Sequence, residues 1–136
     1  MKPLILTVFF LMAVFYVKAQ TSDTLKLSDT GKVFVAVEKE PEFPGGMREF
    51  YLFISKNIHY PAEARANKEQ GRIFVQFVVE RDGSITKVHI VRGVSPSLDK
   101  EALRLMNLSP KWKPGMQNGY PVRVEYSLPI SFNIEF

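Results

Sequence analysis

The sequence of 136 residues contains no cysteine. A chain without cysteine forms no disulfide and carries no lipid on a terminal cysteine, so attachment as a bacterial lipoprotein is excluded and the fold depends on its hydrophobic core alone. Histidine is scarce as well, with only His59 and His89. Two histidines without a cysteine or a close pair of carboxylates make no metal-binding set, so neither a metal nor a cofactor is expected.

Sequence motifs typical of enzyme active sites are missing too. No serine lies in a Gly-x-Ser-x-Gly elbow. Gly45-Gly46 and Asn118-Gly119 do not join a strand to a glycine-rich helix start, where they would bind phosphate, and are expected to form turns. The single tryptophan, Trp112, is expected to pack against the end of a sheet. The sequence therefore predicts a protein that is not an enzyme.

A large excess of one charge is also absent. The chain has 18 basic and 14 acidic residues, a formal net charge of +4. Lys2 and Lys18 belong to an N-terminal segment expected to be removed, which leaves 16 basic against 14 acidic residues, or +2. So small a charge does not support nucleic-acid binding. With 46% hydrophobic and 24% charged residues, the composition is that of one ordinary globular domain.

The N-terminal segment has the features of a secretory signal peptide. Lys2 precedes an almost wholly apolar run, Leu4 to Val17, and Ala19 provides a small residue at a cleavage site. We expect residues 1–19 to be removed after export. The alternative is an uncleaved anchor in the inner membrane, although a bilayer span needs roughly 20 apolar residues. The polar residues 20–32 predict a flexible lead-in to a domain over residues 33–136.

Three helices are predicted after a brief strand over residues 33–37 and an irregular segment over residues 38–46. In the first helix, from Met47, apolar residues recur every three to four positions on a stripe facing a core, namely Phe50, Tyr51, Phe53, Ile54 and Ile58. Pro61 suits the first turn of a short second helix, which continues over residues 62–68 and is closed by Gly71. Ser95, Pro96 and Ser97 precede a third helix over residues 98–108, whose buried stripe is Leu98, Ala102, Leu105 and Met106.

A β-hairpin is predicted over residues 72–92. Two alternating apolar runs flank Asp82-Gly83, a dipeptide typical of a type I′ turn. A two-residue turn places Val79 opposite Thr86 on a mostly apolar face. It places Gln76 opposite His89 on the other, mixed face, which indicates a sheet with one side in solvent.

The last strand is predicted from apolar residues that alternate without interruption between Val122 and Phe136, after a loop over residues 109–121. A hairpin followed by a helix and a strand fits a right-handed crossover, which makes the strand over residues 72–81 central. The predicted fold is α+β: a three-stranded antiparallel sheet covered on one face by helices.

Pro129 lies within this last strand, in the outward-facing set with Arg123, Glu125, Ser127, Ser131 and Asn133. Proline has no N–H, so the flank to which its amide would point is expected to be unpaired within the domain. Two interpretations stay open. The flank accepts a strand from another chain, or Pro129 guards an exposed edge against unwanted pairing.

Six short motifs follow one another between Tyr60 and Val122: Tyr60-Pro61-x-x-Ala64, Gly71-Arg-Ile-Phe-Val-Gln-Phe77, Asp82-Gly83-Ser-Ile85, Leu98-Asp99-x-Glu-Ala102, Trp112-Lys-Pro-Gly115 and Gly119-Tyr-Pro-Val122. In this order they resemble the C-terminal domain of the TonB energy-transducer family. The preceding Val33-Phe34, Val37-Glu38 and Pro41 to Gly46 resemble an extension of Bacteroidota-type members. The resemblance thus covers nearly all of the expected mature chain.

This resemblance implies a TonB C-terminal-like fold and a periplasmic protein-binding module. Its last strand would accept the TonB box of an outer-membrane TonB-dependent receptor as an added strand, in energy-dependent transport. Carried over position by position, the partner-binding residues are His59, Tyr60, Pro61, Arg123, Glu125, Ser127, Pro129, Ser131 and Asn133. His59 stands where other members often have glutamine. We expect the chain to lack the membrane anchor and proline-rich arm of a full transducer, and to reach the inner-membrane motor complex only through another protein.

Two other functions remain open at this point. A structural or assembly module would pair its edge with a second copy and form a strand-exchanged homodimer. A secreted enzyme inhibitor is the third hypothesis, although no exposed reactive loop stands out beyond residues 112–119.

Overall fold

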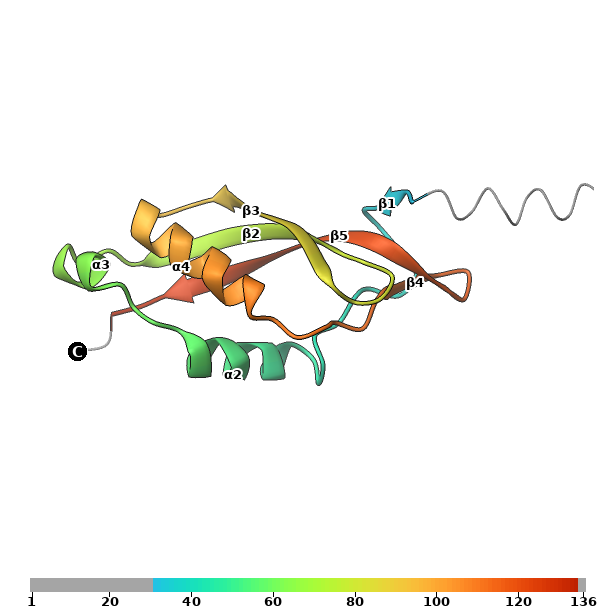
Figure 1. Ribbon diagram of the computed structural model, residues 1–136, viewed down its shortest axis with the longest axis horizontal. Helices are drawn as coiled ribbons and strands as arrows, with labels where there is room; N and C mark the ends of the chain where they lie inside the picture. The colour runs from blue at the N-terminus through green and yellow to red at the C-terminus, as the bar shows by residue number, and fades with distance from the viewer. Residues whose placement is uncertain (1–30, 135–136) are drawn as a thin grey trace, which may run out of the picture. The chain divides into compact units, whose positions relative to one another are not determined.

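The computed structural model describes residues 31–134, which form three helices and five strands (Figure 1). The expected signal peptide and residues 20–30 of the expected lead-in lie outside the described residues. The elements in chain order are β1 (Val33–Phe34), α2 (Met47–Asn57), α3 (Ala62–Ala66), β2 (Gly71–Val79), β3 (Ile85–Arg92), α4 (Pro96–Asn107), β4 (Gly115–Gln117) and β5 (Tyr120–Phe132). No helix within the described range is long and apolar enough to span a membrane.

The sheet has five strands, with the order β1-β5-β2-β3 and β4 attached to β5. As predicted, β2 is central and pairs antiparallel with both β3 and β5. The prediction of three antiparallel strands was wrong in two respects. β1 adds a parallel pairing to β5, and β4 forms from residues that were expected to be a loop. These two strands are too short, at two and three residues, to have a detectable period.

The β2–β3 hairpin differs from its prediction at the turn. Glu80 N donates to Ser84 O at 2.8 Å and Gly83 N to Glu80 O at 2.9 Å. Three residues therefore form the loop, and Gly83 alone has a positive φ, which excludes the predicted type I′ turn there. Val79 consequently lies opposite Ile85 rather than Thr86.

A β-bulge restores the predicted register farther along the hairpin. The pairing shifts between Gln76 and Val78, and the residue left over on the partner strand, Lys87, has a φ of 53°. Beyond it, Gln76 lies opposite His89 and Val75 opposite Ile90, as predicted. A second shift between Val75 and Phe74 then places Phe74 opposite Arg92 rather than opposite the predicted Val91. The bulge allows Ile85, Val88 and Ile90 to pack against the core together.

The helices follow the predicted stripes with one exception. In α2, Phe50 and Ile54 are buried, but Tyr51 is 48% exposed, because it lies about 100° around the helix from Phe50. α3 is shorter than predicted, and Gly71 begins β2 instead of closing that helix. In α4, all four predicted stripe residues are buried, and the Ser95 hydroxyl accepts a hydrogen bond from Leu98 N.

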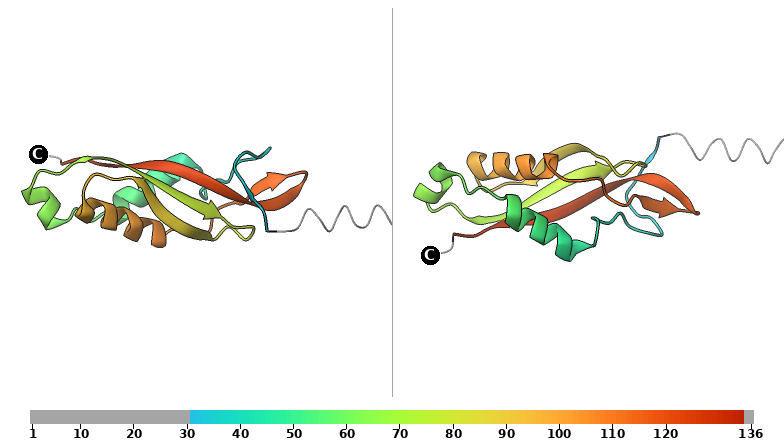
Figure 2. Two further views of the ribbon diagram at one scale, coloured as in Figure 1. Left: turned by 90° about the horizontal axis from the view of Figure 1, so that it is seen from above. Right: turned by 60° about the horizontal axis from the view of Figure 1, so that its bottom comes forward.

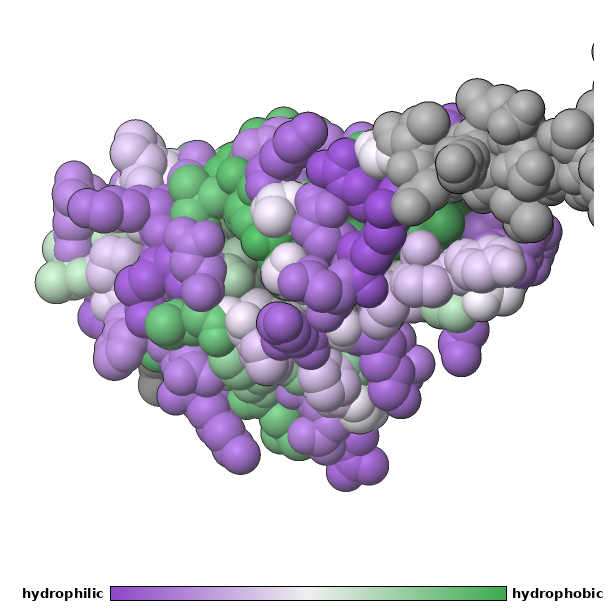
Figure 3. Space-filling model, turned by 45° about the vertical axis from the view of Figure 1, so that its right-hand side comes forward, coloured by the Kyte–Doolittle hydropathy of each residue, from purple (hydrophilic) through white to green (hydrophobic). Residues whose placement is uncertain are grey.

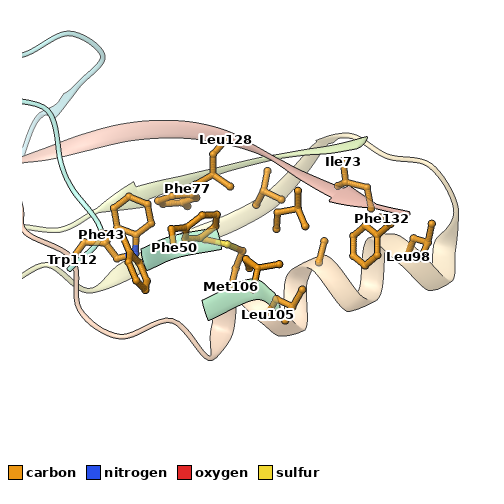
Figure 4. Close-up of a cluster of buried hydrophobic side chains, with 14 of the residues drawn as sticks. Phe43, Phe50, Ile73, Phe77, Leu98, Leu105, Met106, Trp112, Leu128 and Phe132 are labelled. Carbon is orange, nitrogen blue, oxygen red and sulfur yellow. The ribbon is translucent and has the colours of Figure 1, made fainter. Parts of the chain in front are cut away.

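The hydrophobic core lies between one face of the sheet and the helices (Figure 4). Phe50 comes from α2, Leu105 from α4, Phe77 from β2 and Phe132 from β5, and all four side chains are fully buried. In both views of Figure 2, α4 and the long strands extend along the same direction. The opposite face of the sheet carries the alternate residues and is partly open to solvent.

Candidate functional site: the outer edge of β5

The pairing of β5 changes along its length. β2 pairs with residues 124–132, β1 with Arg123 and Val124, and β4 with residues 120–122. Within the described part of the chain, residues 125–132 therefore pair with β2 alone. The expected open rim exists along this part of β5, whereas the start of the strand is covered by the chain itself.

Pro129 indicates which backbone groups face the open flank. It lies opposite Phe74 in a ladder with β2 that continues without a break from Gly71 to Val79. Because proline has no N–H, Pro129 belongs to the alternate residues whose amides point away from β2. By the same alternation, the N–H groups of Glu125, Ser127 and Ser131 point to the open flank.

The side chains of these residues lie on the solvent-facing side of the sheet. Ser127 and Ser131 are exposed, Glu125 and Pro129 are half-buried, and Asn133 is exposed just beyond the end of β5. Glu125 accepts a hydrogen bond from Gln76 Nε2 at 2.5 Å. Gln76 Oε1 in turn lies 3.0 Å from His89 Nε2, so a row of polar side chains crosses β5, β2 and β3.

Arg123 lies in the covered part of β5 and binds Glu80. Its Nε and Nη2 donate to the two carboxylate oxygens of Glu80 at 2.7 and 2.9 Å. Thr86 Oγ1 also donates to this carboxylate, at 2.7 Å. The Arg123 hydrogen bonds, more than any other contact, hold the pKa of Glu80 below its usual value. The guanidinium group of Arg123 is thus engaged in joining strands within the fold.

The Tyr-Pro element lies at the other end of the edge. The Tyr60 ring packs edge-on against Phe132, with 6.1 Å between ring centroids, and Arg65 lies 5.4 Å above it. The Tyr60 hydroxyl donates to Glu69 O. Burial raises the pKa of this hydroxyl. Tyr60 therefore belongs to the surroundings of the end of β5, while Pro61 caps the start of α3.

Glu101 is the glutamate of the Leu98-Asp99-x-Glu-Ala102 motif, but no role was assigned to it from the sequence. Its side chain is only 6% exposed and accepts from Arg104 Nε at 2.5 Å, Arg104 Nη2 at 2.8 Å and His59 N at 2.5 Å. Arg104 Nη2 also donates to Asn57 O at 2.7 Å. The network ties the segment after α2 to α4, and so positions His59 and Tyr60. Its place in that motif and the apolar residues around it in α4 were the signals in the sequence.

Trp112 is buried, as the packing interpretation predicted. It packs edge-on against Phe77, Phe43 and Tyr126, with centroids 5.3 to 5.7 Å apart, and its Nε1 donates to Ser109 Oγ at 2.9 Å. Burial, with smaller contributions from Glu40 and Tyr51, raises the pKa of Tyr126. This cluster supports β5 from the core side.

A family model described as the Gram-negative bacterial TonB protein C-terminal matches residues 56–134. The chain belongs to this family. The match extends from the end of α2 through β5 and so contains the whole open edge together with the Tyr-Pro element. The TonB C-terminal domain is a periplasmic part of a non-enzymatic transport system, and membership implies a role in TonB-type energy transduction and interaction with TonB-dependent receptors in general.

Two solved structures of TonB C-terminal domains are similar to the chain. A solution NMR structure of the Helicobacter pylori TonB-CTD has a TM-score of 0.52 and 23% identity, and the alignment covers 66% of this chain and 81% of that one. A shorter fragment of the same domain has a TM-score of 0.48 and 24% identity, with 64% and 91% covered. The first likeness supports the TonB-CTD fold. No curated protein matches the chain.

Proposed function

We propose that the chain binds the TonB box of an outer-membrane receptor as an added strand along residues 125–132 of β5, as part of energy-dependent transport. The observation that carries this proposal is the open flank of these residues within a TonB C-terminal fold. Membership of the family favours a receptor over other partners. Interaction with the inner-membrane motor would take place through another protein.

Main-chain hydrogen bonds would supply most of the affinity of such a strand. The outward N–H groups of Glu125, Ser127 and Ser131 are available, and the carbonyl of Pro129 adds an acceptor between them. Side chains of the added strand would point alternately to the helix side and to the solvent side. The Tyr60 and Pro61 region, held near Phe132, limits the far end of this site.

The place of action follows from the same proposal. The TonB C-terminal domain works in the periplasm, and the apolar segment over residues 1–19 would serve as the export signal. An anchored form with an uncleaved segment remains the alternative. The N-terminal sequence of the protein recovered from periplasm distinguishes the two, because cleavage predicts a mature chain that begins at Gln20.

The experiment that tests strand addition is an NMR titration with a synthetic TonB-box peptide, using Ser127→Pro and Ser127→Ala. Serine to proline removes one outward N–H from an exposed edge position and leaves the β2 ladder intact. Serine to alanine removes the same hydroxyl and keeps the N–H. We expect amide shifts along residues 125–132 in the native chain and in Ser127→Ala, and at least tenfold weaker binding in Ser127→Pro.

Circular dichroism and thermal unfolding of both variants establish that the fold is retained. Shifts confined to elements away from β5, or equal binding by the proline and alanine variants, would show that the peptide does not add to this edge.

A further inference from the structure

Tyr126 differs from the other side chains on the helix side of β5. Burial alternates along this strand, and Tyr126 lies on the helix-facing side but is only half-buried. It belongs to the part of β5 that pairs with β2 alone, where it lies opposite Phe77. The other helix-facing residues of the strand are all buried, namely Val122, Val124, Leu128, Ile130 and Phe132. Along residues 125–132, the helix side therefore has uncovered aromatic surface at Tyr126.

Helix α2 brings a second exposed tyrosine to the same place. Tyr51 is 48% exposed, and its ring packs edge-on against Phe50 with 5.6 Å between centroids. The buried Trp112 ring continues this row of rings, since it lies 5.9 Å from Phe50 and 5.6 Å from Tyr126. Burial chiefly raises the pKa of the Tyr126 hydroxyl, and Glu40 and Tyr51 are close enough to raise it further. Tyr51 and Tyr126 thus form an exposed pair, which we call the tyrosine shelf.

The tyrosine shelf lies beside the open edge, because α2 follows β5. In Figure 1 and in the right-hand view of Figure 2, α2 lies on the β5 side of the molecule and α4 on the β3 side. Tyr51 lies near Tyr126, and farther along the chain the Tyr60 ring packs edge-on against Phe132. The chain from α2 to the Tyr-Pro element therefore runs along the helix side of the open part of β5.

A strand added to β5 would cover the tyrosine shelf. The residue of that strand opposite Tyr126 points to the helix side, as Tyr126 itself does. Its side chain would lie over the exposed part of the Tyr126 ring and beside Tyr51. Leu128 and Ile130, which follow on the same face, are already buried by the fold and have almost no surface left to cover. An apolar side chain on the partner therefore gains most at the position opposite Tyr126.

We infer that the partner strand carries a large apolar side chain opposite Tyr126, and that Tyr51 of α2 is a specificity-determining residue for it. The inference rests on the proposed strand addition to β5 and names the chemistry of the partner at one position. The family match begins at residue 56, so membership of the family does not imply a contact with Tyr51. Because the main-chain bonds of an edge strand are similar in every register, this side chain also fixes the register of the partner.

The test uses synthetic TonB-box peptides in which Leu, Asn or Lys is placed in turn at each position. Binding to the native chain, Tyr51→Ala and Tyr51→Phe is measured by titration calorimetry and located by NMR. Leu52→Ala is the matched control, because Leu52 is 44% exposed on α2 and lies about 100° around the helix from Tyr51. Circular dichroism and thermal unfolding of each variant establish that the fold is retained.

We expect Leu to bind the native chain about three- to tenfold more tightly than Asn at one position of the peptide. The two neighbouring positions should show no such preference, because their side chains point to the solvent side. Tyr51→Ala should remove most of the preference. Tyr51→Phe should retain it, since the ring rather than the hydroxyl makes the contact, and Leu52→Ala should leave it unchanged.

Several results would overturn the inference and leave strand addition standing. One is equal affinity of the Leu and Asn peptides at every position, with shifts still on β5. Another is tightest binding of a Lys peptide, which would show that Glu40 selects a cation. Equal weakening of the Leu and Asn peptides by Tyr51→Ala would show that Tyr51 supports the fold and does not read the partner.

Two further measurements separate the remaining outcomes. If Tyr51→Ala changes the molar mass of the peptide-free chain in light scattering, the tyrosine shelf belongs to a contact between copies, and the inference is overturned. Absence of peptide shifts along residues 125–132 would overturn the proposed function, and the inference with it.

Discussion

Among single residues, Glu101 joins the segment that carries His59 and Tyr60 to α4. Burial by itself raises the pKa of its carboxyl group, but the hydrogen bonds from Arg104 and His59 outweigh burial, and the resulting pKa is lowered. A carboxyl group whose pKa is lower in the folded than in the unfolded state stabilises the fold at pH values above the unfolded pKa, about 4.3 for glutamate. This stability is lost as the pH falls through the folded pKa.

Replacing Glu101 with glutamine tests this linkage. At neutral pH we expect Glu101→Gln to lower the free energy of unfolding by roughly 1–3 kcal/mol, because the hydrogen bonds from Arg104 and His59 lose a buried, charged acceptor. The variant should also lose less stability between neutral and acidic pH than the native chain does. Urea unfolding across this pH range measures both effects. Glu63→Gln, at an exposed position in α3, is the control and should change neither.

Two glycine-containing dipeptides, Asn118-Gly119 and Asp82-Gly83, adopt different turns because their surroundings differ. Asn118 and Gly119 both have a positive φ and form the type I′ turn between β4 and β5, whereas Asp82-Gly83 forms a three-residue loop. Trp112 explains the difference, because its backbone N–H donates to Gly83 O at 2.8 Å. A Cβ on Gly83 would lie 2.0 Å from the Trp112 carbonyl oxygen, whereas one on Gly119 would meet open space.

These surroundings predict different effects for the same substitution. Gly83→Ala should lower the free energy of unfolding by roughly 2–4 kcal/mol, since it adds a steric clash to the strain of a positive φ. Gly119→Ala has a similar φ and no clash, so it should cost only about 1 kcal/mol. Thermal unfolding of the two variants measures the difference. Equal losses would mean that the Trp112 contact does not constrain the hairpin loop.

The sequence predicted those elements whose period is long enough to detect. β2, α4 and β5 each continue over nine or more residues, and their buried faces were predicted correctly. β1 and β4 were missed as sheet partners because a few residues carry no period. The hairpin loop and the Lys87 bulge depend on contacts with Trp112 and on core packing, which are distant in sequence. For the site, the sequence indicated an edge at Pro129, but it did not reveal that β1 covers Arg123.

At the scale of the whole molecule, the chain covers one part of the outer edge of β5 and leaves the other part exposed. β1 pairs with Arg123 and Val124, and the segment after it is held against β4, where Lys39 N donates to Met116 O at 3.1 Å. The end of the molecule nearest these segments is mostly hydrophilic on the face seen in Figure 3. Residues 125–132 thus remain as one defined length of open strand.

Because residues 125–132 form an open strand edge, pairing with a second copy of the chain competes with pairing with a peptide. Pro129 disfavours pairing with a second copy. An exposed edge with unpaired N–H groups is a template for a second copy, and a proline within it removes one of the required donors. Pro129→Ala restores an outward N–H beside those of Ser127 and Ser131. We expect this variant to dimerise at lower concentration than the native chain, by about threefold to tenfold for one added hydrogen bond.

Molar mass measured by light scattering across a concentration series tests this prediction, with Ser127→Ala as a control that leaves the pattern of donors unchanged. A TonB-box peptide should dissociate the Pro129→Ala dimer, because both partners would use the same flank. If the native chain is already a stable dimer that the peptide does not dissociate, the edge serves assembly, and the strand-exchanged homodimer replaces receptor binding as the function of β5.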